Sequence, residues 1–207
     1  MMPDSEVPIL QTEIERATRR ERPLLRLVRD LLIIVVLAAA LIVPVKYFVA
    51  QPFVVEGGSM VPLLQPHDYV IVDELTYLTH APRRGDIVVF RYPLDPSLYF
   101  IKRLIGLPGE TVELKEGVIH ITPAGATESE PLYESYVAEA QQYAEDSRIE
   151  LGANEYFMLG DNRKASFDSR VWGPVSSRNI LGRAMVRVYP FASAQSLVQH
   201  ADVLYTR

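Results

Sequence analysis

The chain has 207 residues, a formal net charge of −5 at pH 7 and no cysteine. This length fits one ordinary domain, or a small domain with a membrane anchor. The acidic balance argues against a nucleic-acid partner, which usually meets a basic face. The lack of cysteine excludes disulfides, thiolate metal sites and a cysteine nucleophile. The four histidines show none of the spacings typical of zinc sites, so neither a metal nor another cofactor is expected.

Residues 1–30 are polar and rich in arginine, whereas residues 31–50 are mostly apolar. A membrane span needs about 20 mostly apolar residues, and the second stretch reaches that length if Lys46 extends its charged end to the interface. We therefore predict a transmembrane helix over residues 31–50. A buried soluble helix and a cleaved secretory signal are the alternatives. The first needs a large core around it, and Lys46-Tyr47-Phe48 does not resemble a cleavage site.

The charges beside the apolar stretch predict its orientation. Six arginines precede it, and only Lys46 lies near its far end. Basic residues next to a span stay in the cytoplasm. We expect one pass through the cell membrane, with residues 1–30 cytoplasmic and residues 51–207 extracytoplasmic. A bacterial inner membrane and a thylakoid both fit this arrangement.

From residue 51 onward the sequence changes to short runs of β-branched and aromatic residues bounded by glycine and proline, which predict strands. Many short strands with turn signals are typical of packed sheets or a barrel. We expect a mostly β, compact domain of packed antiparallel sheets over residues 51–207. Strands are predicted at Tyr69–Asp73, Asp86–Arg91, Leu98–Ile105, Thr111–Leu114, Val118–Ile121, Glu155–Leu159 and Arg183–Tyr189.

One segment between these strands has little pattern. Residues 122–150 are polar and weakly patterned, which predicts an insertion or surface flap. Within it, Ser135–Glu145 fits a short helix.

Ser59 lies in the apolar-flanked stretch Phe53–Leu64, directly after Gly57 and Gly58. Glycine permits unusual backbone conformations and close approach, and Pro62 fixes its own backbone angle. A turn that merely contains a serine fits this stretch as well as a nucleophile does, because short motifs often match by chance. A serine becomes a good nucleophile only where a base removes its proton.

Lys102 is the candidate for that base, since no histidine lies in a recognisable catalytic context. It stands within the apolar strand Leu98–Ile105, and strand alternation places it on one face with Phe100 and Leu104. Burial on that face lowers a lysine pKa and leaves the amine neutral. A lysine that protects an edge strand against aggregation is the alternative interpretation.

A third polar segment begins at Gly160 and reads Gly-Asp-Asn-Arg-Lys-Ala-Ser-Phe-Asp-Ser-Arg. A solvated loop is one interpretation. The segment lies between two apolar strands, however, and its charges can form a rigid network that positions catalytic groups. The residues available for such pairing are Asp161, Asp168, Arg103, Arg163 and Arg170.

Four sequence blocks that follow the apolar stretch resemble the type I signal peptidase (leader peptidase) family. Its members are membrane-bound Ser–Lys endopeptidases of the S26 group. The blocks are Gly-Ser-Met-Val-Pro at 58–62, Arg-Gly-Asp-Ile-Val-Val-Phe at 84–90, Phe-Ile-Lys-Arg-Leu-Ile-Gly-Leu-Pro-Gly-Glu at 100–110 and Gly-Asp-Asn-Arg-x-x-Ser-x-Asp-Ser-Arg at 160–170. The resemblance covers about residues 30–190. It implies a domain that cuts signal peptides from exported preproteins as they leave the translocon, with the lipid bilayer as a further partner.

The resemblance also implies roles for individual residues. Ser59 corresponds to the nucleophile, whose own backbone N–H helps to hold the oxyanion, and Lys102 corresponds to the general base. The residues that match catalytic support are Ser166, Arg103, Asp161, Asp168 and Arg170, and Ser166 is the one whose hydroxyl orients the lysine. Small pockets that accept alanine-like side chains are implied, formed by the substrate-binding positions Phe53, Val55, Gly57, Met60, Phe100 and Ile101.

Two positions depart from the family pattern. Many members carry a serine at the position of Gly57, where its hydroxyl is a second oxyanion donor, and Leu63 stands where threonine is usual.

Two other functions share parts of the pattern. Self-cleaving Ser–Lys repressors are cytoplasmic, so the apolar stretch argues against them. A membrane-anchored binding domain without catalysis does not need Ser59, Lys102 and Ser166 together.

Overall fold

The computed structural model describes residues 23–44, 51–137 and 146–198. The chain divides into two compact units, Met1–Lys46 and Tyr47–Arg207. Each unit is described by itself.

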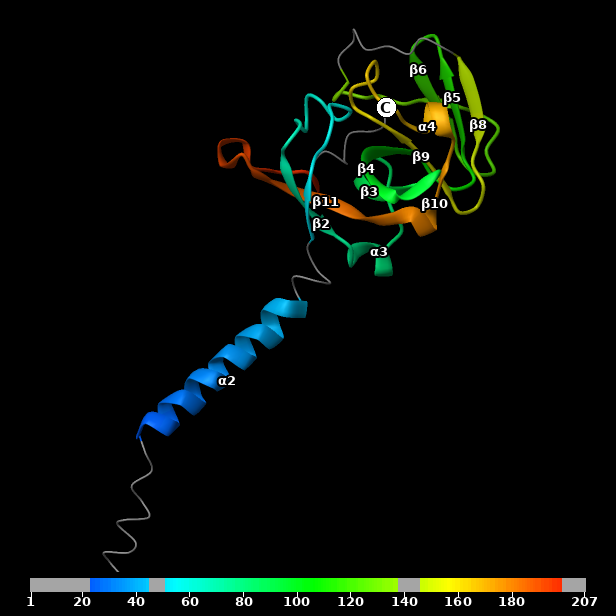
Figure 1. Cartoon of the computed structure of the whole chain (residues 1–207). Helices are drawn as coiled ribbons and strands as arrows, with labels where there is room; N and C mark the ends of the chain where they lie inside the picture. Colours follow the sequence, from blue (N-terminus) through cyan, green and yellow to red (C-terminus); the bar gives the residue numbers. More distant parts are fainter. Residues whose placement is uncertain (1–22, 45–50, 138–145, 199–207) are drawn as a thin grey trace, which may run out of the picture. The chain divides into compact units, whose positions relative to one another are not determined.

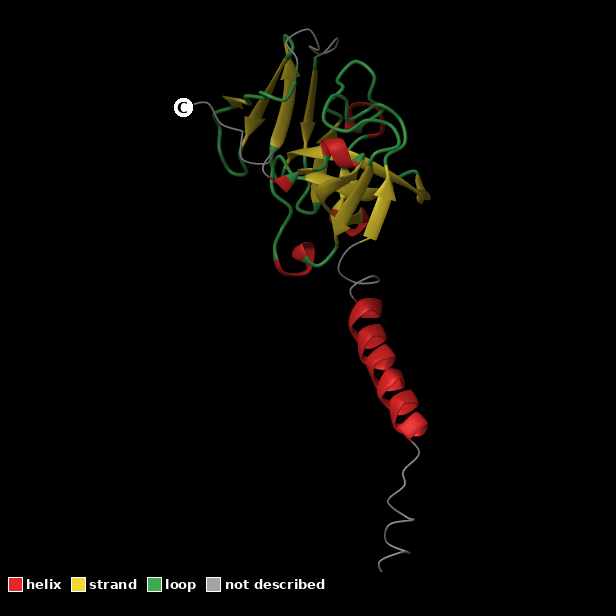
Figure 2. Ribbon diagram, turned by 90° about the vertical axis from the view of Figure 1, so that its left-hand side faces the viewer, coloured by secondary structure: helices red, strands yellow, loops and turns green. Residues whose placement is uncertain are grey.

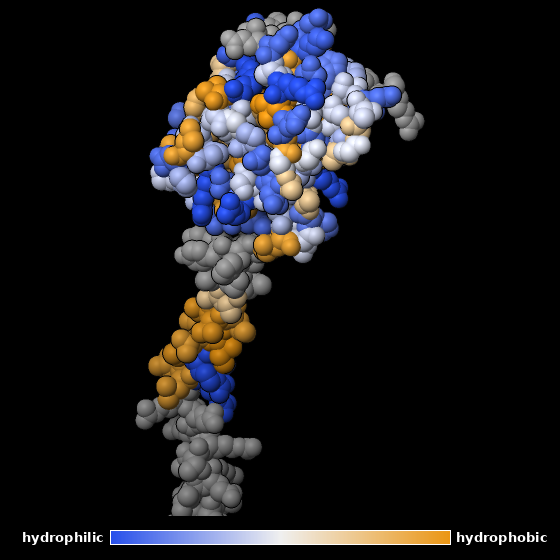
Figure 3. Space-filling model, turned by 90° about the vertical axis from the view of Figure 1, so that its right-hand side faces the viewer, coloured by the Kyte–Doolittle hydropathy of each residue, from blue (hydrophilic) through white to orange (hydrophobic). Residues whose placement is uncertain are grey.

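The described part of the first unit is one helix, α2, at Pro23–Pro44 (Figure 1). Proline suits the first helical position because its missing N–H needs no partner there, and the many leucine and alanine residues favour helix. The side chains of residues 24–40 are all exposed. Figure 3 shows hydrophobic residues over most of this helix, with a hydrophilic patch on one side.

No helix among the described residues has the length and apolar character needed to cross a membrane. Of the transmembrane helix expected over residues 31–50, residues 31–44 are helical and residues 45–50 lie outside the described part of the chain. The spanning helix therefore stays a prediction. So does the cytoplasmic segment expected over residues 1–30, of which residues 1–22 are not described.

The second unit is mostly β and contains two antiparallel sheets (Figures 1 and 2). Among the described residues, the larger sheet has the order β1-β2-β11-β3-β4-β9-β10, with β12 paired to β11, and the smaller has the order β7-β6-β5-β8. Every described pairing is antiparallel. The expected mostly β domain of antiparallel sheets is thus confirmed.

The strands are β1 Gln51–Val54, β2 Tyr69–Asp73, β3 Ile87–Tyr92, β4 Asp95–Gly106, β5 Thr111–Lys115, β6 Val118–Thr122, β7 Glu130–Pro131, β8 Ser147–Glu150, β9 Glu155–Leu159, β10 Val175–Ser176, β11 Ile180–Tyr189 and β12 Gln195–Ser196. The short helices are α3 Thr76–Thr79, α4 Ser169–Trp172, η3 Ser177–Asn179 and η4 Phe191–Ser193.

Strand β3 is covered on both faces, which makes it the centre of the larger sheet's core. On one face Val88 and Phe90 pack with Leu104 and form the Leu104 cluster. On the other face Val89 packs with Val55 and forms the Val55 cluster. Because side chains alternate along a strand, a continuous apolar run such as β3 indicates burial on both sides.

Strand β4 changes environment along its length. Its first seven residues are exposed or half-buried, and its last five are buried. Strand β9 pairs with it only from Arg103 onward. Among the described strands, residues 99–102 therefore pair with β3 alone, which leaves one backbone edge of this segment open.

The segment over residues 122–150 is not a flap along its whole length, contrary to the sequence prediction. Strands β7 and β8 pair with β6 and β5, and Leu132 is buried in the core of the smaller sheet. Residues 135–137 of the expected short helix form a turn, and residues 138–145 lie outside the described part. The polar pattern does not reveal the strand because only alternate residues of β8 are half-buried. The residues between them, Arg148 and Glu150, are exposed and charged.

Candidate active site

Ser59 and Lys102 are in direct contact, although 43 residues separate them in the sequence. The Nζ atom of Lys102 lies 2.8 Å from Ser59 Oγ and donates a hydrogen bond to the carbonyl of Ile101 at 3.0 Å. Ser59 comes from the turn after β1, and Lys102 from the open-edge part of β4. An amine and a hydroxyl at this distance can exchange a proton directly.

The surroundings of Lys102 favour the neutral amine. The residue is only 5% exposed. Burial lowers the pKa of Lys102 from 10.5 to about 8, although the negative charges of Asp168 and Asp161 act in the opposite direction. Burial dominates because an ammonium ion loses its hydration when it leaves water.

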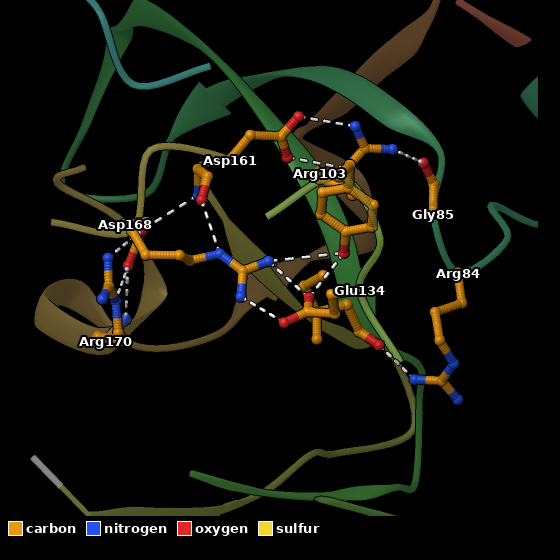
Figure 4. Close-up of polar contacts among 11 residues, drawn as sticks. Arg84, Gly85, Arg103, Glu134, Asp161, Asp168 and Arg170 are labelled. Carbon is orange, nitrogen blue, oxygen red and sulfur yellow. Dashed lines mark hydrogen bonds and ion pairs between the residues drawn. The ribbon is translucent and has the colours of Figure 1, made fainter. Parts of the chain in front are cut away.

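Two ion pairs hold the carboxylates near Lys102 (Figure 4). Arg103 donates to both oxygens of Asp161, at 2.8 and 2.7 Å, and the two side chains are 0% and 1% exposed. Arg170 contacts Asp168 through Nε and Nη2, each at 2.8 Å. Figure 4 also shows Arg103 reaching the carbonyl of Gly85, at 3.0 Å. The four charged residues that were expected to support the site therefore form two pairs.

The loop that starts at Gly160 packs closely on the turn that carries Ser59. The backbone N–H of Asn162 donates to the Ser59 carbonyl, and its side-chain amide donates to the Gly58 carbonyl, both at 3.0 Å. A Cβ on Gly160 would lie 2.5 Å from the Ser59 carbonyl oxygen, so only glycine permits this approach. Neither residue is singled out by the sequence analysis; their place in the 160–170 block is the signal that points to them.

Ser166 lies against Gly160. Its Oγ atom is buried and has no hydrogen-bond partner among the described residues. The hydrogen bond through which Ser166 was expected to orient Lys102 is therefore not formed in this structure, where Lys102 Nζ contacts Ser59 and Ile101 instead. The orienting role of Ser166 stays a prediction.

Ser59 and Lys102 lie on the wall of a cavity of about 500 Å³. Most of the lining comes from residues 53–59 and residues 97–102. Further lining comes from Val70, Val89, Ala165 and Phe167. Of the positions expected to contact substrate, those that line the cavity are Phe53, Val55, Gly57, Phe100 and Ile101. The described residues contain no group of three or more His, Cys, Asp or Glu side chains suited to a metal ion.

Two residues of the turn that carries Ser59, Met60 and Gly57, have different environments. Met60 is fully buried in the Val55 cluster and is absent from the cavity lining. The substrate contact expected of Met60 stays a prediction, and in this structure its apolar side chain lies beneath the turn and anchors Ser59 to the core. Gly57 has a φ of 75°, a left-handed conformation in which any other residue is strained. This backbone explains why glycine rather than serine suits the position in this chain.

Comparison with known proteins identifies the family of this chain. Residues 28–189 match the family described as signal peptidase, peptidase S26. The chain belongs to this family. A probable signal peptidase I-1 of Synechocystis is 37% identical over 166 residues, which cover 77% of this chain and 80% of the relative. Signal peptidase I of Leptolyngbya laminosa is 38% identical over 180 residues, which cover 83% of each. The crystal structure of a signal peptidase I from Enterococcus faecalis V583 is 32% identical with a TM-score of 0.43, covering 51% of this chain and 98% of that one.

Two residues that follow β7, Glu134 and Tyr136, extend the network of charged residues. The Arg103 guanidinium lies 3.9 Å from the centre of the Tyr136 ring. The Tyr136 hydroxyl donates to Glu134 at 2.6 Å, and both Glu134 oxygens accept from Arg163, at 2.6 and 2.5 Å. Arg163 in turn donates to the Gly160 carbonyl at 2.9 Å. Burial raises the pKa of Tyr136, which keeps its hydroxyl protonated as a donor.

The pairing of Arg163 with Glu134 is not what the sequence suggests, since Asp161 and Asp168 are nearer along the chain. Glu134 lies 29 residues from Arg163, within the stretch whose polar pattern predicts a flap. Nothing local in the sequence marks it. Only the packing of the segment after β7 against the 160–170 loop brings the two charges together.

We expect Glu134→Gln to destabilise the protein strongly. The change removes the negative charge that faces Arg163, whose side chain is 0% exposed, and breaking a buried pair on one side costs about 3–5 kcal/mol. Urea unfolding of the full chain in detergent measures this. The matched control is Glu150→Gln, which removes a charge from the exposed pair with Arg148 and should cost less than about 1 kcal/mol. Equal losses for the two variants would show that the Glu134 contact is not a strong buried pair.

Proposed function

We propose that this protein is a serine endopeptidase that removes N-terminal signal peptides from exported preproteins. Ser59 acts as nucleophile and Lys102 as general base, and cleavage follows small residues. The observation that carries the proposal is the 2.8 Å contact between Ser59 Oγ and Lys102 Nζ on the cavity wall. A lysine accepts a proton only when neutral, and the burial of Lys102 favours that form.

In the first step, Ser59 Oγ forms a bond to the carbonyl carbon of the scissile peptide while its proton moves to Lys102 Nζ. The carbonyl oxygen becomes an oxyanion, which the backbone N–H of Ser59 stabilises. Protonated Lys102 then donates its proton to the peptide nitrogen and the C–N bond breaks. The mature chain leaves as an amine, and the signal peptide remains bound to Ser59 as an ester.

In the second step, Lys102 is again neutral and takes a proton from a water molecule. The water oxygen attacks the ester carbon, and a second oxyanion forms at the same place. The bond to Ser59 Oγ then breaks, and Lys102 returns the proton to that oxygen. One residue thus does the proton transfers that a histidine performs in a Ser–His–Asp triad.

The arginines near Lys102 support this mechanism. A carboxylate beside a lysine favours the protonated form and raises its pKa. Asp161 and Asp168 do act in this direction. Their pairing with Arg103 and Arg170 offsets that negative charge with positive charge, so burial remains the larger effect. We infer that these four residues support catalysis by keeping the base neutral and in place.

We further propose that the substrate lies extended between residues 53–59 and residues 97–102. Within the latter segment, residues 99–102 have a backbone edge that no described strand occupies, and extended peptides bind such edges by adding a strand. On the side of the Val55 cluster, the cavity is lined by Phe53, Val55 and Ile101. Apolar walls of this kind accept alanine-sized side chains and exclude larger ones.

We place the enzyme in the cell membrane as a single-pass protein, with residues 31–50 as the anchor. Residues 1–30 are cytoplasmic and residues 51–207 lie outside, where signal peptides leave the translocon. The apolar sequence of the anchor supports this proposal, as does the arginine cluster before it. The exposed apolar side chains of α2 agree with it, because such a surface needs a lipid or protein environment.

Fusion of reporters to Arg207 tests this orientation. We expect a reporter that works only outside the cytoplasm to be active there, because the arginines hold residues 1–30 inside. A cytoplasm-only reporter at the same position should be inactive. Activity of the cytoplasmic reporter would contradict the proposed topology.

Substitutions in the dyad should abolish cleavage of a signal-peptide substrate by detergent-solubilised enzyme. We expect Ser59→Ala, Lys102→Ala and Lys102→Arg each to lower kcat/KM by at least about 10³-fold, as loss of a nucleophile or base does. Arginine fails because its guanidinium is not deprotonated in proteins. The control is Lys115→Arg on the exposed end of β5, which should cleave normally. Full activity of Lys102→Arg would refute the lysine assignment.

Activity should fall as pH falls through about 8, because the pKa of Lys102 lies near that value and only the neutral amine is a base. Below this pH we expect kcat/KM to drop about tenfold per pH unit, and above it to level off. A pH–rate profile with one substrate measures this. A profile that keeps rising toward 10.5, the ordinary lysine value, would show that burial does not tune this amine.

A further inference from the structure

One wall of the cavity is aromatic and extends into solvent. Phe167, from the 160–170 loop, lines the cavity although its side chain is 49% exposed. Its ring lies 5.9 Å from Tyr92 and 6.4 Å from Phe100 in edge-to-face geometry. Tyr92 and Phe100 stack on each other at 4.7 Å, and Trp172 lies 6.0 Å from Tyr92. Phe167 is therefore an exposed ring on a rigid aromatic base, and the catalytic steps above make no use of it.

The wall with Phe100 and Phe167 and the wall with Phe53, Val55 and Ile101 lie on opposite faces of β4. Side chains alternate along a strand, so Phe100 and Ile101 point to different sides. Phe100 packs against the Leu104 cluster, whereas Ile101 packs against the Val55 cluster. Both line the cavity, which therefore wraps around the open edge of residues 99–102.

This arrangement assigns substrate side chains to the two walls, and the assignment rests on the proposed function. A peptide that lies along the open edge of β4 also alternates its side chains. The last residue of the signal peptide, which is small, faces the wall formed by Phe53, Val55 and Ile101. Its two neighbours in the chain then face the other wall: the penultimate residue of the signal peptide and the first residue of the mature protein.

We propose that Phe167 is a specificity-determining residue whose exposed ring contacts the substrate side chains that flank the small residue at the cleavage site. It favours large apolar or aromatic side chains at those two positions. The attraction comes from burial of apolar surface on both partners and from edge-to-face contact with the ring. The neighbouring rings of Tyr92 and Phe100 hold the Phe167 ring in place, so little side-chain freedom is lost on binding.

Cleavage of matched peptides by the full chain in detergent tests the proposal. One parent signal-peptide substrate is made with Ala or Phe at the penultimate position, and separately at the first mature position. A third pair differs at the third-last position of the signal peptide. Its side chain faces the Ile101 wall, as the last residue does, and therefore points away from Phe167. We expect the wild type to prefer Phe over Ala by about three- to tenfold in kcat/KM at one or both flanking positions, the scale of an aromatic contact.

Phe167→Ala should bring that ratio close to one, and Phe167→Tyr, which keeps the ring, should preserve it. Phe191→Ala is the matched control, because this phenylalanine is 81% exposed and outside the cavity lining; it should leave the ratio as in the wild type. An unchanged ratio in Phe167→Ala, or an equal change at the third-last position, overturns the proposal. If the wild type cleaves none of the peptides, the proposed function itself fails, and this inference with it.

Discussion

The burial of Lys102 beside Ser59 constrains much of the surrounding structure. A lysine taken out of water stays neutral only if no unbalanced negative charge lies close to it. Two carboxylates do lie close, and each one contacts an arginine. Arginine suits this task better than a second lysine would, because its planar guanidinium binds a carboxylate through two parallel hydrogen bonds and keeps its charge at any working pH. In the proposed mechanism, the pKa of the base thus depends on residues that lie outside the cavity lining.

The same network explains why the smaller sheet matters to the site. Arg103 contacts Asp161 on one side and the ring of Tyr136 on another, and Glu134 joins Tyr136 to Arg163. Buried ion pairs add little net stability, since the desolvation of both charges offsets their attraction. Their effect here is geometric. They fix the 160–170 loop, which holds the turn of Ser59, relative to both sheets.

How far the site can be predicted depends on whether its signals are local. Ser59 has one in its glycine-rich turn, and Lys102 has one as a charge within an apolar strand. The partners Arg103 and Asp161 lie in short blocks whose charges stand out from their surroundings. Glu134 has no such signal, because its role depends on packing between segments far apart in sequence. Met60 is a second case without a local signal, because its place next to Ser59 does not reveal that its side chain packs in the core.

The pairing register of β4 separates the two cations that follow each other in the chain. Lys102 lies opposite Val88, and Arg103 lies opposite both Ile87 and Leu159. Strand alternation therefore points the lysine toward Ser59 and the arginine toward Asp161. A slip of one residue would exchange the two faces and place a guanidinium, which cannot lose its proton, beside the serine. The apolar residues that fix this register in β3 and β9 thus determine the chemistry of the site as well as the fold.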